Sequence, residues 1–337
     1  MKKLRFGILG CGGMARHHAI KINENPDAEL VALCDVNEQI TGTFADFVVG
    51  KHFPRPQTYT DPAVMYREAG LDAVAIVTPH TLHFQHGIQA LEAGCHVMME
   101  KPMVTSSSDA YLLAAKVEET GKTLVVGFIT SFSPVFQYLR REIRAGTFGR
   151  LQMVNGYLSQ GWLKGTIGLW RQNPELSGGG QAYDSGAHIL NSMMWSVESP
   201  VAEVYALLDN CGSPVDINSV ISVRFQNNVM GSICVSGDCP SSGSHMVFIF
   251  DGGRVEIDGW GASWIKPFKN GTAIEPELPS GMDGPINNLV DCILGSAEPA
   301  TTPLNGILHS ELMDAIYESA AKGQPVKNKP TPVAIKK

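Results

Sequence analysis

The first 125 or so residues alternate short apolar runs with amphipathic stretches, and this alternation restricts the possible folds more than any other feature. The apolar runs are Leu4–Leu9, Leu30–Cys34, Ala73–Val77, His96–Met99 and Leu124–Val126. The stretches between them with helical spacing are Met14–Asn23, Glu38–Val48, Leu82–Ala93 and Ser108–Thr120. Strands that are apolar throughout are typical of a parallel sheet with helices on both faces. The pattern therefore predicts an α/β domain with a doubly wound parallel sheet over residues 1–127.

The remainder of the chain, residues 128–337, predicts an α+β domain with an open, largely antiparallel sheet. Its expected strands are Leu151–Ser159, Glu203–Leu208, Ser219–Phe225, Val229–Val235, His245–Phe250 and Arg254–Ile257. Turn residues between neighbouring strands suggest a meander. Expected helices are about Ala182–Trp195, Pro285–Leu294 and Gly306–Lys322, and the last two are candidates to pack back on the first domain. Ser131–Pro134 is read as a break.

Composition excludes several classes of protein. The chain has 26 Lys and Arg against 33 Asp and Glu, a net charge of −7, which disfavours a nucleic-acid partner. No apolar window is long enough to span a membrane, and the first residues are too rich in glycine for a signal peptide. The seven cysteines are scattered and form no CxxC pair, so we expect reduced thiols, a cytoplasmic location and no structural metal.

A glycine-rich turn follows the first apolar run. Residues 10–15 read G-x-G-x-x-A and open an amphipathic stretch. Gly10 permits a tight turn, and Gly12 lets a pyrophosphate approach the backbone. Gly13 and Met14 begin the helix, whose N-terminus attracts anions. The pattern predicts a dinucleotide site, with a flavin site or a nucleotide-free turn as the alternative.

Asp35 ends the second apolar run, where an acidic residue can accept the ribose hydroxyls of a dinucleotide. Its charge would repel a 2′-phosphate, so NAD is favoured over NADP. Cys11, within the turn, is expected to be packed rather than reactive.

Two further places carry candidate chemistry. Lys101, in Glu100-Lys101-Pro102, follows an apolar strand, and a lysine at a carboxyl strand end can stabilise a developing alkoxide. Asp184 and His188 are four residues apart, which on a helix places them on one face. Histidine suits proton transfer near neutral pH, and a carboxylate one turn away can orient it. The glycine run before them lets a ligand or another backbone segment come close.

Several histidines and a Trp-Arg pair are further candidates for functional residues. His80, His83 and His86 do not share one helix face and no carboxylate joins them, so no metal site is predicted. His17 and His18 are expected to face solvent. Trp170 and Arg171 stand before the glycine run and are candidates for a substrate pocket.

Together these motifs resemble the Gfo/Idh/MocA oxidoreductase family of glucose–fructose oxidoreductase and inositol dehydrogenase. The resemblance spans nearly the whole chain and rests on residues 7–12, 78–83, 90–94, 100–102 and 178–188. The resemblance implies a Rossmann domain followed by an α/β domain whose open sheet makes a homodimer or homotetramer. It further implies that Lys101 and His188 flank the reacting carbon and that Asp184 helps to place the substrate.

The same resemblance implies that Thr78, Pro79, His80 and His83 line the cofactor site and that Glu100 lies beneath the nicotinamide. The sequence departs from the family at His80, where Asn is frequent, and at residues 129–131, where many members carry polar Asn or Arg. Sugar specificity therefore cannot be copied from the family.

The expected activity is hydride transfer between nicotinamide and a secondary alcohol of a sugar, polyol or glycoside. Lys101 would polarise the oxygen, and His188 would act as general acid or base. Two alternatives stay open at this point. One is a redox-neutral glycoside hydrolase or lyase that keeps NAD bound, and the other is an NAD-binding regulator without catalysis.

Overall fold

The computed structural model describes residues 2–281 and 283–328, and the chain divides into two compact units. The first unit contains the residues up to Gly127 together with Asp283–Pro303. The second unit begins at Phe128 and includes the residues from Leu304 onward. The boundary near residue 127 was expected, whereas the return of residues 283–303 to the first unit could only be named as a possibility.

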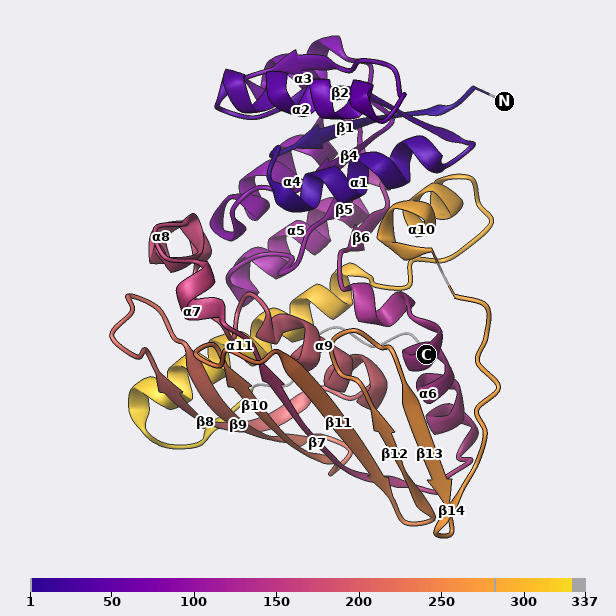
Figure 1. Ribbon diagram of the computed structural model, residues 1–337, viewed down its shortest axis with the longest axis vertical. Helices are drawn as coiled ribbons and strands as arrows, with labels where there is room; N and C mark the ends of the chain where they lie inside the picture. The colour runs from indigo at the N-terminus through magenta and orange to yellow at the C-terminus, as the bar shows by residue number, and fades with distance from the viewer. Residues whose placement is uncertain (1, 282, 329–337) are drawn as a thin grey trace. The chain divides into compact units, whose positions relative to one another are not determined.

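The first unit is built on six parallel strands in the order β3-β2-β1-β4-β5-β6 (Figure 1). Their bounds are β1 (Leu4–Leu9), β2 (Ala28–Cys34), β3 (Gln57–Tyr59), β4 (Ala73–Ile76), β5 (His96–Met99) and β6 (Leu124–Val126). This order is that of a Rossmann fold, and it reverses between β1 and β4. Ligands of such sheets bind at the carboxyl ends of the strands at this reversal.

Helices flank this sheet. They are α1 (Gly13–Glu24), α2 (Glu38–Gly50), α3 (Pro62–Glu68), α4 (His83–Glu92), α5 (Ser107–Thr120) and α10 (Gly284–Ile293), with a 3₁₀ turn η1 (His80–Leu82). Helix α1 contacts α2 and α10, and α4 contacts α5. Helix α10 also contacts β5 and β6, which explains why it belongs to this unit. The residues of β4 are fully buried, as the doubly wound arrangement predicts.

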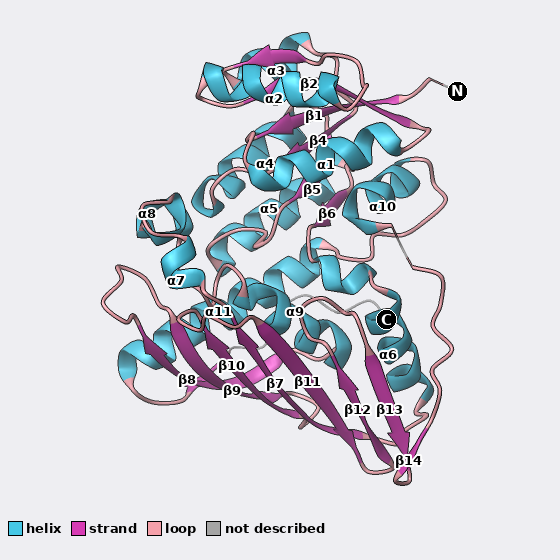
Figure 2. Ribbon diagram, in the orientation of Figure 1, coloured by secondary structure: helices cyan, strands magenta, loops and turns pink. Residues whose placement is uncertain are grey.

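The second unit contains a nine-stranded sheet in the order β14-β13-β12-β11-β7-β10-β9-β8-β15 (Figure 2). Its strands are β7 (Leu151–Ser159), β8 (Val201–Asp209), β9 (Asn218–Phe225), β10 (Met230–Ser236), β11 (Gly243–Phe250), β12 (Gly253–Ile257), β13 (Ile265–Lys269), β14 (Thr272–Ala273) and β15 (Val326–Lys327). Strand β7 lies between β10 and β11 and runs parallel to β10, while the other pairs are antiparallel. The expectation of a simple meander is therefore wrong at β7, although the sheet is largely antiparallel.

The helices of the second unit are α6 (Pro134–Ala145), α7 (Trp162–Gly165), α8 (Pro174–Ser177), α9 (Gly186–Val197) and α11 (Pro303–Lys322), with 3₁₀ turns η2 (Ile129–Phe132) and η3 (Trp170–Gln172). Helix α9 contacts β7 and β10, and α6 packs on α9. Helix α6 was not predicted, because Ser133-Pro134 was read as a break. The Ser133 hydroxyl accepts the Phe136 N–H, and Pro134 occupies the first helical turn, so these residues start a helix.

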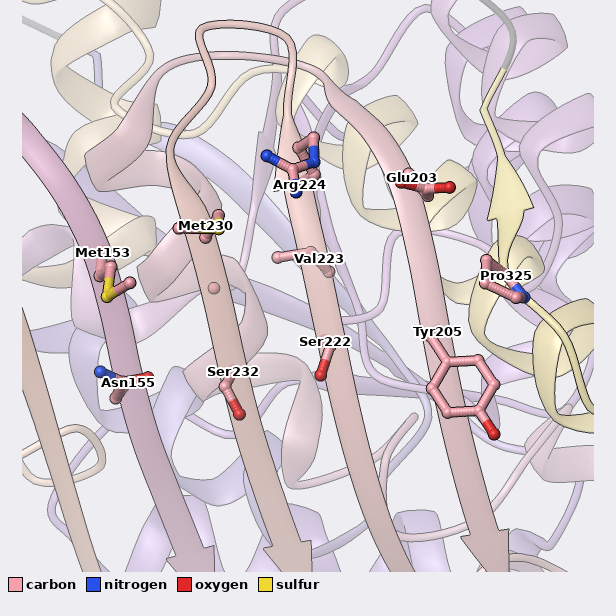
Figure 3. Close-up of a pocket in the computed structure, with 11 residues that line it drawn as sticks. Met153, Asn155, Glu203, Tyr205, Ser222, Val223, Arg224, Met230, Ser232 and Pro325 are labelled. Atoms are coloured by element: carbon pink, nitrogen blue, oxygen red, sulfur yellow. The ribbon is translucent and has the colours of Figure 1, made fainter.

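The face of this sheet that points away from α9 is exposed to solvent over its central strands. Along β9 the buried residues alternate with exposed ones, so Val220, Ser222 and Arg224 point away from the core. Figure 3 shows this face, with Tyr205 on β8 and Met153 on β7 among its side chains. Within the part of the chain that the structure describes, no helix has the length and apolar character needed to cross a membrane.

Candidate functional site

The glycine turn between β1 and α1 has the geometry of a phosphate cradle. Gly10 has a φ of +92°, and a Cβ there would lie 2.7 Å from the carbonyl carbon and oxygen of Val77. Only glycine fits this position. A Cβ on Gly12 or Gly13 would meet no atom within 4 Å, so this side of the turn faces open space. Since Gly12 is the N-cap of α1, the first N–H groups of the helix receive no side-chain cap. The turn therefore fits the pyrophosphate of a dinucleotide.

Asp35 is held beside this turn at the end of β2. Its Oδ2 accepts the Cys11 N–H at 2.9 Å, and its Oδ1 accepts the Asn37 N–H at 3.0 Å. The carboxylate is thus oriented by two main-chain donors and is half-buried, which suits a group that accepts ribose hydroxyls. Burial raises the pKa of the neighbouring Cys11 thiol, consistent with a packed side chain.

Thr78 and His83 form a second cluster at the carboxyl end of β4. His83 is fully buried, with Nδ1 2.8 Å from the carbonyl oxygen of Pro102 and Nε2 2.8 Å from that of Thr78. Both ring nitrogens therefore contact main-chain oxygens, so His83 links two segments of the chain. Its expected place beside the cofactor stays a prediction. The Thr78 hydroxyl pairs with His86 Nδ1 at 3.0 Å, and His80 is buried.

Glu100 and Lys101 follow β5 at the same edge of the sheet. Glu100 Oε1 lies 2.7 Å from His18 Nε2, and Glu100 Oε2 accepts the Lys101 N–H at 3.1 Å. His18 is only 1% exposed, so the expectation that it faces solvent is wrong, whereas His17 is exposed as expected. The helical periodicity of α1 could not show this, because Glu100, which covers His18, follows β5.

Asp184 lies in the second unit, in the turn that precedes α9. The sequence placed it inside that helix, but α9 begins at Gly186. Asp184 is 6% exposed, and its Oδ2 accepts the indole Nε1 of Trp162 at 2.8 Å and Nε of Arg171 at 2.9 Å. A buried carboxylate needs such partners to remain ionised. The sequence named Arg171 but missed Trp162, since tryptophan by itself gives no signal of a polar contact.

His188 lies in the first turn of α9 and is 6% exposed. Its ring meets that of Trp260 edge to face, with centroids 4.9 Å apart and planes at 85°. The Ser192 hydroxyl donates to the His188 carbonyl oxygen at 2.8 Å. The His188 ring is therefore buried against an aromatic neighbour.

Trp170 and Arg171 stand beside Asp184 on the turn η3. The Arg171 guanidinium carbon is 4.5 Å from the Trp170 ring centroid, a cation–π distance. Of the residues expected to contact substrate, Trp170, Arg171 and Asp184 are therefore linked in one chain of contacts. Lys101 belongs to the first unit, and Asp184 and His188 belong to the second.

The glycine run before Asp184 is explained by close packing against a buried carboxylate. Asp216 Oδ1 accepts the Gly180 N–H at 2.8 Å, and its Oδ2 accepts the Ala182 N–H at 2.9 Å. The Tyr317 hydroxyl donates to Asp216 Oδ1 at 2.5 Å, and burial raises the pKa of Tyr317 well above its ordinary value. The sequence left room at these glycines for a ligand or for another backbone segment, and the structure shows a backbone segment there.

Replacing Gly180 with alanine is expected to destabilise the protein by about 3 kcal/mol or more. The new Cβ would lie 1.9 Å from the Asp216 carbonyl oxygen, so the backbone must shift. Denaturant unfolding measures the loss. The control is Gly42→Ala in α2, where a Cβ meets nothing within 4 Å and helix propensity predicts a gain of about 0.5–1 kcal/mol. Equal stability of the two variants would contradict the assignment of Asp216 as the cause of the glycine run.

Comparison with known proteins identifies the chain. Residues 4–128 match the model described as an oxidoreductase family with an NAD-binding Rossmann fold, Gfo/Idh/MocA. Residues 136–259 match the model of the C-terminal domain of the same family. The chain belongs to the Gfo/Idh/MocA oxidoreductase family. The family expected from the sequence motifs is thus confirmed, and its NAD-binding Rossmann domain covers residues 4–128.

Several curated relatives of this Gfo/Idh/MocA member are named as dehydrogenases. D-glucoside 3-dehydrogenase of Escherichia coli strain K12 is 30% identical over 206 residues, which is 59% of this chain and 56% of the relative. The scyllo-inositol 2-dehydrogenase (NAD(+)) of Bacillus subtilis strain 168 is 31% identical over 156 residues, which is 46% of this chain and 44% of the relative. These matches thus span about half the length of the relatives.

A solved structure resembles the chain over its full length. The WlbA dehydrogenase from Bordetella pertussis, in complex with NADH and UDP-GlcNAcA, is 26% identical and has a TM-score of 0.86, with 99% of each chain covered. The match therefore covers both the six-stranded parallel sheet and the nine-stranded mixed sheet.

Proposed function

We propose that this chain is an NAD(H)-dependent dehydrogenase that oxidises a secondary alcohol of a sugar, polyol or glycoside, or reduces the corresponding ketone. The observation that carries the proposal is the main chain of Lys101, which Glu100 holds at the carboxyl ends of the strands that also present the glycine turn and Asp35. A cationic side chain at that edge suits an oxygen that becomes negatively charged. The names of the relatives, which act on a glucoside and an inositol, support the substrate class.

The cofactor proposed is NAD, with NADP the less favoured choice. The turn at Gly10, Gly12, Gly13 and Met14 would hold the pyrophosphate, and Asp35 would accept the ribose hydroxyls. Two main-chain N–H donors hold the Asp35 carboxylate in place beside the turn. Its negative charge would repel a 2′-phosphate there. Thr78, Pro79, His80 and His83 are proposed to line the cofactor site, and Glu100 to lie beneath the nicotinamide.

When bound, the nicotinamide ring supplies the hydride chemistry. The Lys101 ammonium would donate a hydrogen bond to the substrate oxygen and stabilise negative charge on it. His188 would take the hydroxyl proton at an imidazole nitrogen during oxidation and return it during reduction. Asp184, held by Trp162 and Arg171, would place the substrate, and Trp170 and Arg171 would border it.

A screen at 340 nm tests the proposal. Purified protein is mixed with NAD or NADP and with a panel of sugars, inositols and sugar acids. We expect NADH to form with one class of compound, and faster than NADPH. If none forms while a chromogenic glycoside is cleaved without added cofactor, the redox-neutral alternative replaces the proposal. If nothing reacts and NAD changes only the assembly state, the regulator alternative does.

We also propose a homodimer or homotetramer that pairs through the open sheet face. The face exposes large apolar side chains, which monomeric proteins seldom gather in one patch; they are Met153, Tyr157, Tyr205, Leu207, Val220 and Met230. Light scattering on a sizing column checks this, and a monomer mass at micromolar protein would contradict it. The seven cysteines are all free, which supports the proposal of a cytoplasmic protein.

A further inference from the structure

Two buried histidines contact the residues next to Lys101 in the sequence. His18 contacts Glu100, and His83 contacts Pro102. On the N-terminal side, His18 Nε2 lies 2.7 Å from Glu100 Oε1, and the other carboxylate oxygen accepts the Lys101 N–H. On the C-terminal side, His83 Nδ1 lies 2.8 Å from the Pro102 carbonyl oxygen. His18 comes from α1 and His83 from α4, so two separate helices reach the same three residues.

The surroundings of the His18 ring show which of its nitrogens donates a hydrogen bond. Its Nδ1 is buried and has no hydrogen-bond partner among the described residues. A buried N–H without a partner is costly, whereas a lone pair without one costs less. Nε2 is therefore the protonated nitrogen and donates to the Glu100 carboxylate. In this form His18 orients Glu100, whose second oxygen is then directed at the Lys101 main chain.

His83 connects the ends of two neighbouring strands. Its Nε2 contacts the Thr78 carbonyl oxygen after β4, and its Nδ1 contacts the Pro102 carbonyl oxygen after β5. The ring therefore sets the distance between the segment proposed to line the cofactor and the segment that carries Lys101. Burial lowers the pKa of His83, while the two carbonyl oxygens and the Glu100 charge act in the opposite direction. Lys101 also favours the neutral ring, and the rings of His80 and His86 lie nearby.

We propose that His18 and His83 are positioning residues that hold the main chain of Lys101, so that its ammonium group reaches the substrate oxygen in one fixed place. The inference rests on the proposed role of Lys101 and adds two residues to it. It matters for rate because an error of about 1 Å in the position of a reacting group can cost on the order of 100-fold.

Both oxygens that face the His83 ring can only accept, so the neutral ring donates a hydrogen bond to one of them and the protonated ring to both. The test finds by substitution which of the two contacts matters. Asparagine has its Nδ2 donor as many bonds from the main chain as histidine Nδ1, so His83→Asn can restore the bond to Pro102. Glutamine has its Nε2 donor in the place of histidine Nε2, so His83→Gln can restore only the bond to Thr78. His83→Phe keeps a ring and restores neither. By the same logic His18→Gln can donate to Glu100, and His18→Phe cannot.

For the substrate found in the screen, we expect both phenylalanine variants to lower kcat about 10- to 100-fold, with NADH affinity changed no more than about threefold. His83→Asn and His18→Gln should recover most of the rate, and His83→Gln should recover less than His83→Asn. The control is His96→Ala, which removes a bond from the Thr123 N–H to a histidine at the other end of β5. This variant should lose thermal stability and keep its kcat.

A purely structural role would lower stability and leave kcat unchanged, or would make His83→Asn and His83→Gln equal, and either result would overturn the inference. Hydrogen exchange of the peptide 96–104 in the presence of NADH gives a readout that needs no turnover. We expect faster exchange in His83→Phe and restored protection in His83→Asn. If the unmodified chain oxidises no compound, the proposed function fails, while unchanged exchange in His83→Phe would refute the positioning role itself.

Discussion

Replacing Lys101 with methionine is expected to lower kcat at least ~100-fold while NADH still binds. Methionine keeps an unbranched side chain of similar length and lacks the ammonium group. The main-chain contacts of Lys101 with Glu100, and of Pro102 with His83, do not depend on that group. The loss should therefore come from charge stabilisation at the substrate oxygen, which acts on the transition state more than on binding.

Steady-state kinetics with the substrate from the screen, and NADH fluorescence for binding, measure the two quantities. Lys122→Met is the matched control. Lys122 precedes β6 and so lies at the amino ends of the strands, whereas Lys101 lies at their carboxyl ends. It should retain normal turnover. A Lys101→Met variant with near-normal kcat would remove Lys101 from the proposed chemistry.

Replacing His188 with alanine is expected to have an effect of similar size, at least ~100-fold on kcat, since it removes the proposed proton acceptor. The ring lies against Trp260 and is buried, so the variant leaves a cavity of about its size. Added imidazole should enter that space and restore part of the rate. The pH dependence of kcat should also become weaker in the variant.

The same imidazole series applied to Lys101→Met serves as the control and should give no rescue. This comparison distinguishes a lost base from general damage to the site. If His188→Ala turns over normally, or if imidazole rescues both variants equally, His188 is not the proton acceptor.

Elements whose signal is local could be predicted closely. The run Leu4–Leu9 is β1, and the stretches expected at 14–23 and 38–48 are α1 and α2 within a few residues. A parallel strand buried on both faces is apolar along its length, so its bounds can be read from the chain. Gly10 and Asp35 were recognised for a similar reason, because their roles depend on the backbone of one turn and the strand beside it.

Contacts between distant segments could not be predicted. His18 looks like a polar helix residue until β5 brings Glu100 to its ring, 82 residues away. The glycines at 178–180 left room for a ligand or for another backbone segment, and the structure shows the main chain of Asp216 packed against them. The start of α9 at Gly186 likewise depends on these contacts, because Asp216 holds the preceding residues in a turn.

The sequence by itself determined the Rossmann sheet, the phosphate turn, the family and the residue types available for proton and charge chemistry. Only the tertiary structure decided which carboxylate holds which side chain, that β7 lies parallel to β10, and that His83 contacts two carbonyl oxygens. The physical reason is the range of the forces involved. Hydrophobic periodicity and turn geometry act over a few residues, whereas a buried hydrogen bond requires a partner that only the folded chain brings within 3 Å.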